Sequence, residues 1–464
     1  MEHGGKYFSG QRFVMKNKTR KIRIAAAYVS LITILTLLVA AYSYAAERLT
    51  LEQAVDAALA NNPALKAADE QVRAADAGML RSASGFLPNV TLSETLSRTD
   101  NPLMVLGMKL NQELVTPLDF TPDAINHPDP ITNYNTRLSV TQPVWNGGKE
   151  YLGRKQAKLA REASVQDRTR ARQETVFNVI KAYYGLLLAR EYHKVAVQSL
   201  ETSAANVKLA EARYKAGTVL QSDLLRASVQ YAEVKEMATR SENGIKLAVA
   251  GLNYAMGAQQ QTDYEIDGAL TTKEMENDLN AMMAEALAQR PDLASLGLNR
   301  RNAEANISRA RADYIPALNL MGQLDWNSDR FAGDEGRSWA VMAVLQWNLF
   351  DGLVTTANVR EASANAGRMK ALEDQMRSGV QLQVQQAYYN LHSSLDRIAA
   401  TSSSVREAEE GLRIVQKRYE VGMTTFVDVL GAESALIRAK TNALQALYDN
   451  NVAHAELKLT TGTL

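Results

Sequence analysis

The chain has 464 residues, with 52 Lys and Arg, 51 Asp and Glu and no Cys, and its mean hydropathy is −0.25. The balanced charge argues against a nucleic-acid-binding protein, because such proteins carry a clear basic excess. No stretch after residue 45 approaches about 18 consecutive apolar residues, which excludes a helical multi-span membrane protein. Without Cys the protein has neither disulfides nor a lipidated cysteine, so buried area or assembly must stabilise it.

The N-terminal segment has the features of a secretory signal. Basic residues precede an apolar run from Ile24 to Ala41, and Ser43 and Ala45 form a small-x-small cleavage site. We therefore predict that residues 1–45 are a signal peptide. A retained membrane anchor is the alternative, although the run is short for a spanning helix. In either case we expect the rest of the chain to lie outside the cytoplasm.

The remainder of the sequence contains two copies of one unit. Segment 51–63 parallels 279–291 at an offset of 228, and further on the offset becomes 205. The pairs that carry the second offset are Gly147 and Gly352, Tyr183 and Tyr388, Gly217 and Gly422, Asp223 and Asp428, and Gly257 and Gly462. The change in offset lies between Pro88 and Val144, so we predict a longer hairpin tip in the first copy.

This duplication predicts the domain organisation of the mature chain. We expect a first repeat at 46–257, a linker or equatorial segment at 258–278, and a second repeat at 279–464. All ten prolines lie between residues 63 and 143 or at 291 and 316, so the second half of each repeat is free of this helix breaker.

Each proline-free region is predicted to form a long helical hairpin, at 149–256 and 353–460. The first arms, rich in Ala, Leu, Gln, Glu, Arg and Lys, would be rods of roughly 100 Å at about 1.5 Å per residue. A glycine ends each arm, and Ser222 or Thr425 can cap the returning helix. A helix over 63–86 would stack end to end with the first returning helix. The two stacked helices would together nearly match the length of the rod.

Between the helices the hydrophobic period changes to two. The alternation predicts strands at 89–98, 133–145, 317–327 and 338–349, long enough to cross a bilayer when tilted. Four strands cannot close a barrel, and open edges are prohibitive in lipid, so several chains must share one barrel. The pattern alone allows two, three or four copies.

These motifs, in this order and repeated twice, resemble the TolC-like outer-membrane efflux protein family over essentially the whole mature chain. The segments that carry the resemblance are 51–63, 87–88, 142–148, 315–316, 347–352 and 418–430. The resemblance implies a mainly α fold with a membrane β-barrel portion. Three internally duplicated chains would form a helical tunnel and a shared 12-stranded barrel, with a mixed belt near 257–278 and the C-terminus.

The resemblance also implies the partners and the location. We expect a homotrimer in the outer-membrane lipid of a Gram-negative bacterium, with a long periplasmic portion. Its far end would meet a periplasmic adaptor and an inner-membrane pump of the RND, ABC or MFS type. No cofactor, nucleic acid or metal is expected, and the channel would not be an enzyme.

Two turns of the hairpins resemble the grooves in which the family docks its adaptor. Small and apolar side chains there would let another hairpin pack closely, although an ordinary helix turn needs only the glycine. The residues of the two turns are Gly217, Thr218, Val219 and Leu220 in the first copy, and Gly422, Met423, Thr424 and Thr425 in the second.

Three further residues correspond to the family's periplasmic gate. The resemblance implies that Asp428 forms a ring by symmetry and that Asp223 is linked to Tyr419, which closes the tunnel mouth. The alternative role of both carboxylates is a favourable interaction with a helix N-terminus. Thr424 and Gly431 stand where some members have a basic and a second acidic residue, so we expect closure to be weaker or different here.

Other conspicuous residues do not indicate catalysis. The Tyr183–Tyr184 and Tyr388–Tyr389 pairs are interpreted as packing anchors, and the five histidines lack metal-ligand spacing. The favoured function is passive export of small molecules such as drugs through a tripartite efflux pump. A type I protein secretion channel and, in another class, a periplasmic coiled-coil adaptor are the alternatives.

Overall fold

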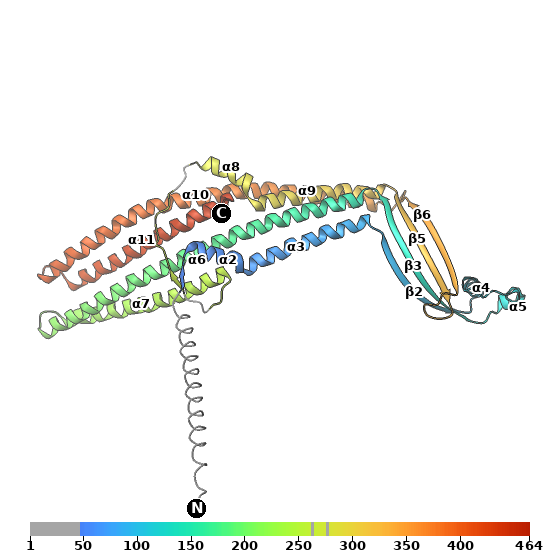
Figure 1. Ribbon diagram of the computed structural model, residues 1–464. Helices are drawn as coiled ribbons and strands as arrows, with labels where there is room; N and C mark the ends of the chain where they lie inside the picture. Colours follow the sequence, from blue (N-terminus) through green and yellow to red (C-terminus); the bar gives the residue numbers. More distant parts are fainter. Residues whose placement is uncertain (1–46, 261–263, 275–277) are drawn as a thin grey trace, which may run out of the picture.

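The computed structural model describes residues 47–260, 264–274 and 278–464. The molecule is elongated, with helical rods at one end and a group of strands at the other (Figure 1). The predicted signal peptide at 1–45 lies outside the described residues. No helix in the described part of the chain is long and apolar enough to cross a membrane.

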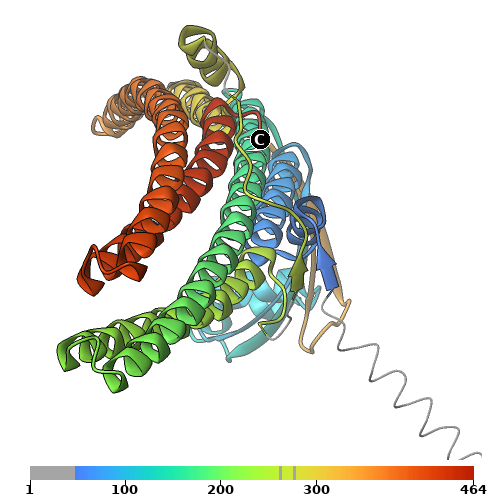
Figure 2. The same ribbon diagram turned by 90° about the vertical axis from the view of Figure 1, so that its left-hand side faces the viewer.

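Two long helices form the rods, as predicted. Helices α6 (Lys149–Lys215) and α10 (Val354–Glu420) each contain 67 residues. At about 1.5 Å per residue each is roughly 100 Å long. Their returning partners, α7 (Gln221–Met256) and α11 (Phe426–Thr461), have 36 residues each. The two resulting hairpins lie side by side and curve together (Figure 2).

The shorter helices complete the rods by stacking end to end with the returning helices. Helix α3 (Pro63–Ala83) follows α2 (Leu51–Asn61), and α9 (Pro291–Arg311) follows α8 (Leu279–Gln289). Gly257, with φ +67°, ends α7 so close to the start of α3 that a Cβ would lie 2.8 Å from Asn62 Cα. Gly462 meets Arg290 in the same way, at 3.2 Å. The repeated glycine therefore permits the stacking that the sequence predicted.

Four antiparallel strands form a sheet in the order β2-β3-β5-β6. Their bounds are β2 (Asn89–Thr99), β3 (Ile131–Asn146), β5 (Ala317–Ser328) and β6 (Gly336–Gln346). The last strand ends three residues before the predicted 349, and β3 has 16 residues with a register shift between Pro143 and Trp145. Large apolar side chains on one face are exposed, including Leu92, Val341 and Leu345.

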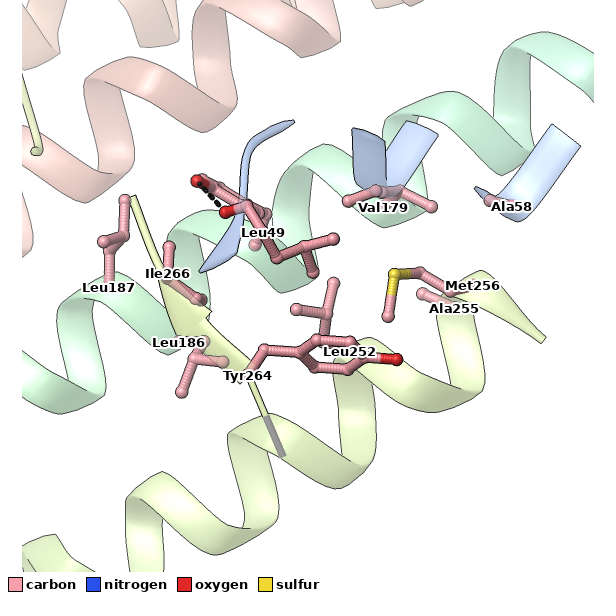
Figure 3. Close-up of a cluster of buried hydrophobic side chains, with 12 residues drawn as sticks. Leu49, Ala58, Val179, Leu186, Leu187, Leu252, Ala255, Met256, Tyr264 and Ile266 are labelled. Carbon is pink, nitrogen blue, oxygen red and sulfur yellow. Dashed lines mark hydrogen bonds between the residues drawn. The ribbon is translucent and has the colours of Figure 1, made fainter. Parts of the chain in front are cut away.

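A buried cluster joins the start of the first repeat, at Leu49, to the linker between the repeats (Figure 3). Strand β1 (Glu47–Leu49) pairs in parallel with β4 (Tyr264–Ile266), and both cover α6 and α7. The Tyr183 hydroxyl donates to the backbone oxygens of Leu49, at 3.1 Å, and of Asp267, which confirms Tyr183 as a packing anchor. Burial raises the pKa of Tyr183 to about 12. Its counterpart in the second repeat, Tyr388, also packs against a buried cluster, whereas the neighbouring Tyr389 is 60% exposed on the single chain.

The linker also crosses the second hairpin, where two adjacent amides of α11 hold its backbone. Asn450 Oδ1 accepts from the Lys273 amide at 2.7 Å, and Asn451 Nδ2 donates to the Thr271 oxygen at 2.8 Å. Within the predicted belt near 257–278, the described residues 264–274 contain strand β4 and contact both repeats.

The additional residues of the first repeat fold into helices beyond the strands. They form α4 (Pro102–Asn111), the 3-10 turn η2 (Pro117–Phe120) and α5 (Pro122–Asn126). Asn101 and Thr121 cap the starts of α4 and α5, and prolines stand at the first helical positions. The sequence predicted the position of this insertion but only as a longer tip.

Candidate functional site

The two hairpin turns at the end of the rods are built alike. In the first tip (216–220) Gly217 has φ +72°, and the Thr218 amide donates to the Arg213 oxygen at 3.0 Å. In the second tip (421–425) Gly422 has φ +76°, and the Met423 amide donates to the Arg418 oxygen at 2.8 Å. This bond to the last turn, with glycine in the left-handed region, is the Schellman motif. Each tip needs its glycine for that reason alone.

Apolar side chains project from both tips. Leu220 in the first and Met423 in the second are 72% and 71% exposed. Exposed side chains of this size cost free energy unless another surface covers them. The tips therefore offer two small apolar contact points beside backbone that the glycines leave uncovered.

The second tip holds Asp428 firmly. Its Oδ2 accepts hydrogen bonds from Thr424 Oγ1 at 2.6 Å, Thr425 Oγ1 at 2.7 Å and the Thr425 amide at 3.0 Å. The Thr424 bond and then the Thr425 bonds lower the pKa of Asp428 to about 2. Thr425 is the N-cap of α11 and forms a capping box with Asp428. The helix-terminus role considered for this carboxylate is therefore present in the structure.

The first tip has no such cap. The N-cap of α7 is Leu220, which makes no side-chain cap, and Ser222 lies inside the helix, so the predicted Ser222 cap is wrong. Asp223 occupies the position matching Asp428, and its amide donates to the Leu220 oxygen at 3.1 Å. Within the described chain no hydrogen bond joins Asp223 to Tyr419.

Tyr419 instead joins the two hairpins through other residues. The Arg213 guanidinium lies over its ring, 4.6 Å from the centroid, and Phe426 packs against it at 5.5 Å. Phe426 and Val429 of the second hairpin are buried together with Ala210 and Ala227 of the first. An apolar cluster just behind the tips therefore holds the two hairpins together, and the Arg213 guanidinium covers the ring of Tyr419 beside it.

A second contact between the hairpins lies further along the rods. Asn206 Nδ2 on α6 donates to Glu433 Oε1 on α11 at 2.7 Å, and Glu433 is buried. Burial raises the pKa of Glu433, partly offset by the Asn206 bond. Glu433 did not stand out in the sequence, because Ser228 occupies its position in the first repeat. A lone acidic residue on a polar helix gives no signal of burial.

Comparison with known proteins identifies the family to which this duplicated fold belongs. Residues 54–258 and 282–463 match the family described as Outer membrane efflux protein. The chain belongs to this family. The two matched segments correspond to the two repeats, so the family assignment rests on both halves of the chain. Family and fold are those of channel proteins, as the sequence predicted.

The similar members of the outer membrane efflux family match over much of their length. TolC of Escherichia coli strain K12 is 25% identical over 347 residues, which cover 70% of this chain and 69% of TolC. BepC of Brucella suis is 22% identical over 456 residues, which cover 96% of this chain and 91% of BepC. AprF of Pseudomonas aeruginosa, named an alkaline protease secretion protein, is 24% identical over 420 residues, covering 88% and 83%.

Solved structures confirm the fold. The CmeC outer membrane channel of Campylobacter jejuni superposes with a TM-score of 0.77 at 18% identity, covering 89% of this chain and 85% of CmeC. CusC superposes with a TM-score of 0.76 at 18% identity, covering 89% and 92%. The predicted fold, mainly helical and duplicated with a few strands, is thus that of the outer membrane efflux channels.

Proposed function

We propose that the chain is the subunit of a homotrimeric outer-membrane duct that passively exports small molecules within a tripartite efflux pump. The observation that carries this proposal is the four-stranded sheet, which exposes one apolar face and ends in two unpaired edges, β2 and β6. In lipid both edges need partners, and identical chains supply them when β6 of one subunit meets β2 of the next. Three copies give the 12 strands of the family barrel.

The rods supply the second part of the duct. Four helical columns per chain, at roughly 100 Å, would wall a tunnel that leads from the membrane into the periplasm. A periplasmic adaptor alone would need one hairpin between β domains, whereas this chain has two hairpins and a membrane-type sheet. That alternative is therefore disfavoured by the architecture.

We further propose that the two tips dock the adaptor through the residues predicted from the sequence. The support is the exposure of Leu220 and Met423 next to Gly217 and Gly422, where another helical hairpin can approach closely. The adaptor would then connect the duct to an inner-membrane pump, which supplies the energy.

The gate residues remain part of the same proposal. A ring of three Asp428 carboxylates at the tunnel mouth would favour cations and repel one another, so closure must come from neighbouring contacts. Tyr419 would contribute by holding the hairpins together through Arg213 and Phe426. Asp223, which makes no side-chain hydrogen bond within the described chain, would be available to a neighbouring subunit.

The cargo distinguishes two candidate functions. OpmQ of Pseudomonas aeruginosa, 22% identical over 400 residues, is named for pyoverdine export, whereas AprF is named for protease secretion. Export of a small dye and of a secreted polypeptide should be measured in the same deletion strain. We expect loss of dye export, and selective loss of polypeptide secretion would favour the type I secretion channel.

A variant at the tips tests the docking part. Thr218→Glu combined with Met423→Glu should abolish export and cross-linking to the adaptor, while trimers still assemble. Thr239→Glu, an exposed threonine on α7 away from the tips, is the matched control. Export that survives the double change would contradict docking. A monomeric, water-soluble protein without conductance in planar bilayers would overturn the channel itself.

A further inference from the structure

The insertion of the first repeat is anchored to one face of the sheet. Gln112, next to the end of α4, is 1% exposed, and its Nε2 donates to Asn133 Oδ1 at 2.7 Å and to the Thr132 oxygen at 2.9 Å. Asn133 in turn donates to Asn327 Oδ1 at 2.9 Å. An amide network therefore joins α4 to β3 and β5 on the polar face.

Gly336, the first residue of β6, gives independent evidence for the same placement. A Cβ there would lie 1.7 Å from the Asn111 oxygen and 3.0 Å from Gln112 Cα. Gly336 pairs with Asn327, so its missing side chain would point to the same polar face. Glycine is required because the end of α4 crosses the sheet at this point.

This polar face is the one that would line the pore. Its other members include Arg137, whose Nε lies 2.7 Å from Asp325 Oδ1. The opposite face carries the exposed apolar side chains Val90, Leu92 and Val341, which suit lipid. Helix α4 therefore covers the inner side of the sheet at the end furthest from the rods (Figure 1).

The insertion also exposes several large apolar side chains. Val105 is buried, whereas Leu103 is 81% exposed, Leu118 is 76% exposed, and Leu110 is also exposed. A short apolar helix face in contact with water is unfavourable. Its position over the pore, away from the lipid face, indicates that more protein covers it.

We propose that three copies of the insertion pack against one another across the external mouth of the pore and form an apolar plug. This inference rests on the proposed trimeric channel. Twelve strands about 4.8 Å apart and tilted by about 40° enclose a barrel roughly 24 Å across. A helix of about 10 Å diameter against the inner wall reaches close to the axis, so three such helices meet.

Such a plug acts on passage. An apolar constriction excludes water and ions until it opens. The second repeat cannot contribute an equivalent, because its hairpin connects β5 to β6 through residues 329–335 alone. Each subunit therefore supplies one plug element, and threefold symmetry brings the three together.

Cysteine cross-linking tests the contact, and the chain provides a background without Cys. Leu103→Cys should form disulfide-linked dimers when oxidised in the outer membrane, because one thiol of three stays unpaired. Leu96→Cys, on the lipid face of β2, is the matched control and should stay monomeric. Intact trimers without cross-links would overturn the plug, and labelling of Leu103→Cys by a lipid-embedded thiol reagent would assign α4 to the bilayer.

A second experiment measures the closure itself. Ser139→Cys places a thiol on the polar face of β3, and a bulky membrane-impermeant maleimide added to intact cells reports access from outside. Leu103→Asp with Leu110→Asp should speed labelling several-fold, because the altered side chains are exposed and repel one another. Equal labelling rates with and without these changes would overturn the plug. A chain that forms no trimer would instead contradict the proposed function.

Discussion

The two hairpin tips share a backbone but differ in how the next helix begins. Both end the long helix with a left-handed glycine, and in both the glycine and the residue after it donate backbone hydrogen bonds to the last turn. After the second tip Thr425 caps α11 and Asp428 completes the box, whereas α7 begins after Leu220 without a side-chain cap. The duplicated acidic residues Asp223 and Asp428 are therefore not equivalent.

This difference shows which of the two carboxylates at the tips is held rigidly. Asp428 is held by three hydrogen bonds in its own chain, while Asp223 makes none through its side chain in the described structure. A fixed carboxylate can contribute to a ring of constant geometry. A carboxylate without local partners can instead bind a neighbouring subunit and release it.

The largest effect on stability is expected when a large side chain is removed from the buried cluster that joins the two hairpins behind the tips. Phe426→Ala removes a side chain that is 3% exposed, and such changes cost about 3–5 kcal/mol. Because Phe426 packs between Tyr419 and residues of the first hairpin, hydrogen exchange should accelerate in both tips. Leu225→Ala, at an exposed site on α7, is the control. Acceleration in the second tip alone would contradict a shared cluster.

Removing the N-cap side chain should affect the helix after the second tip and leave the helix after the first tip unchanged. Thr425→Ala should cost about 1 kcal/mol of local helix stability, which raises exchange in the first turn of α11 roughly fivefold. Ser222→Ala should leave the first turn of α7 unchanged, because Ser222 caps nothing. Equal effects in hydrogen exchange mass spectrometry would mean that the tips start their helices alike.

The sequence predicted the periodic parts of the molecule and missed contacts between them. The long helices follow from helix-forming composition without proline, and Gly257 and Gly462 repeat at the offset of 205 where helices stack. Four strands and the position of the insertion were also predicted, although the last strand begins at Gly336 and ends at Gln346 where the sequence predicted 338–349. These features depend on residues that lie close together along the chain, so local sequence predicts them.

The site was harder to predict because its contacts join distant segments. The pairing of Arg213 with Tyr419 and of Asn206 with Glu433 depends on how two hairpins lie side by side, which no local pattern records. The Ser222 cap failed because Leu220, and not the serine, has the extended backbone of an N-cap. The helical fold of 102–126 likewise depends on its anchor at Gln112.

A smaller effect is expected from the cation over Tyr419. Arg213→Ala removes a cation–π contact worth about 0.5–1 kcal/mol at exposed sites. The second tip should then separate slightly from the first, which distance measurements between spin labels on the two tips would detect. Arg213→Lys should retain most of the contact. An unchanged distance distribution in Arg213→Ala would show that Phe426 alone sets the spacing.

The smallest effect is the acid response of the second tip. The pKa of Asp428 lies near 2 and the ordinary value is 3.8, so the fold favours the ionised carboxylate. Its contribution is complete above about pH 4 and is lost as the pH falls through about 2. Infrared difference spectra of wild type against Asp428→Asn should show the carboxylate band disappearing near pH 2.

The same measurement isolates the role of Thr424. Thr424 supplies the first of the bonds that lower the Asp428 pKa. Thr424→Val removes this donor and keeps the shape, so the carboxylate midpoint should rise toward 3.8. Thr218→Val, in the first tip, should leave it near 2. A midpoint that stays near 2 in Thr424→Val would mean that the capping box alone holds the charge.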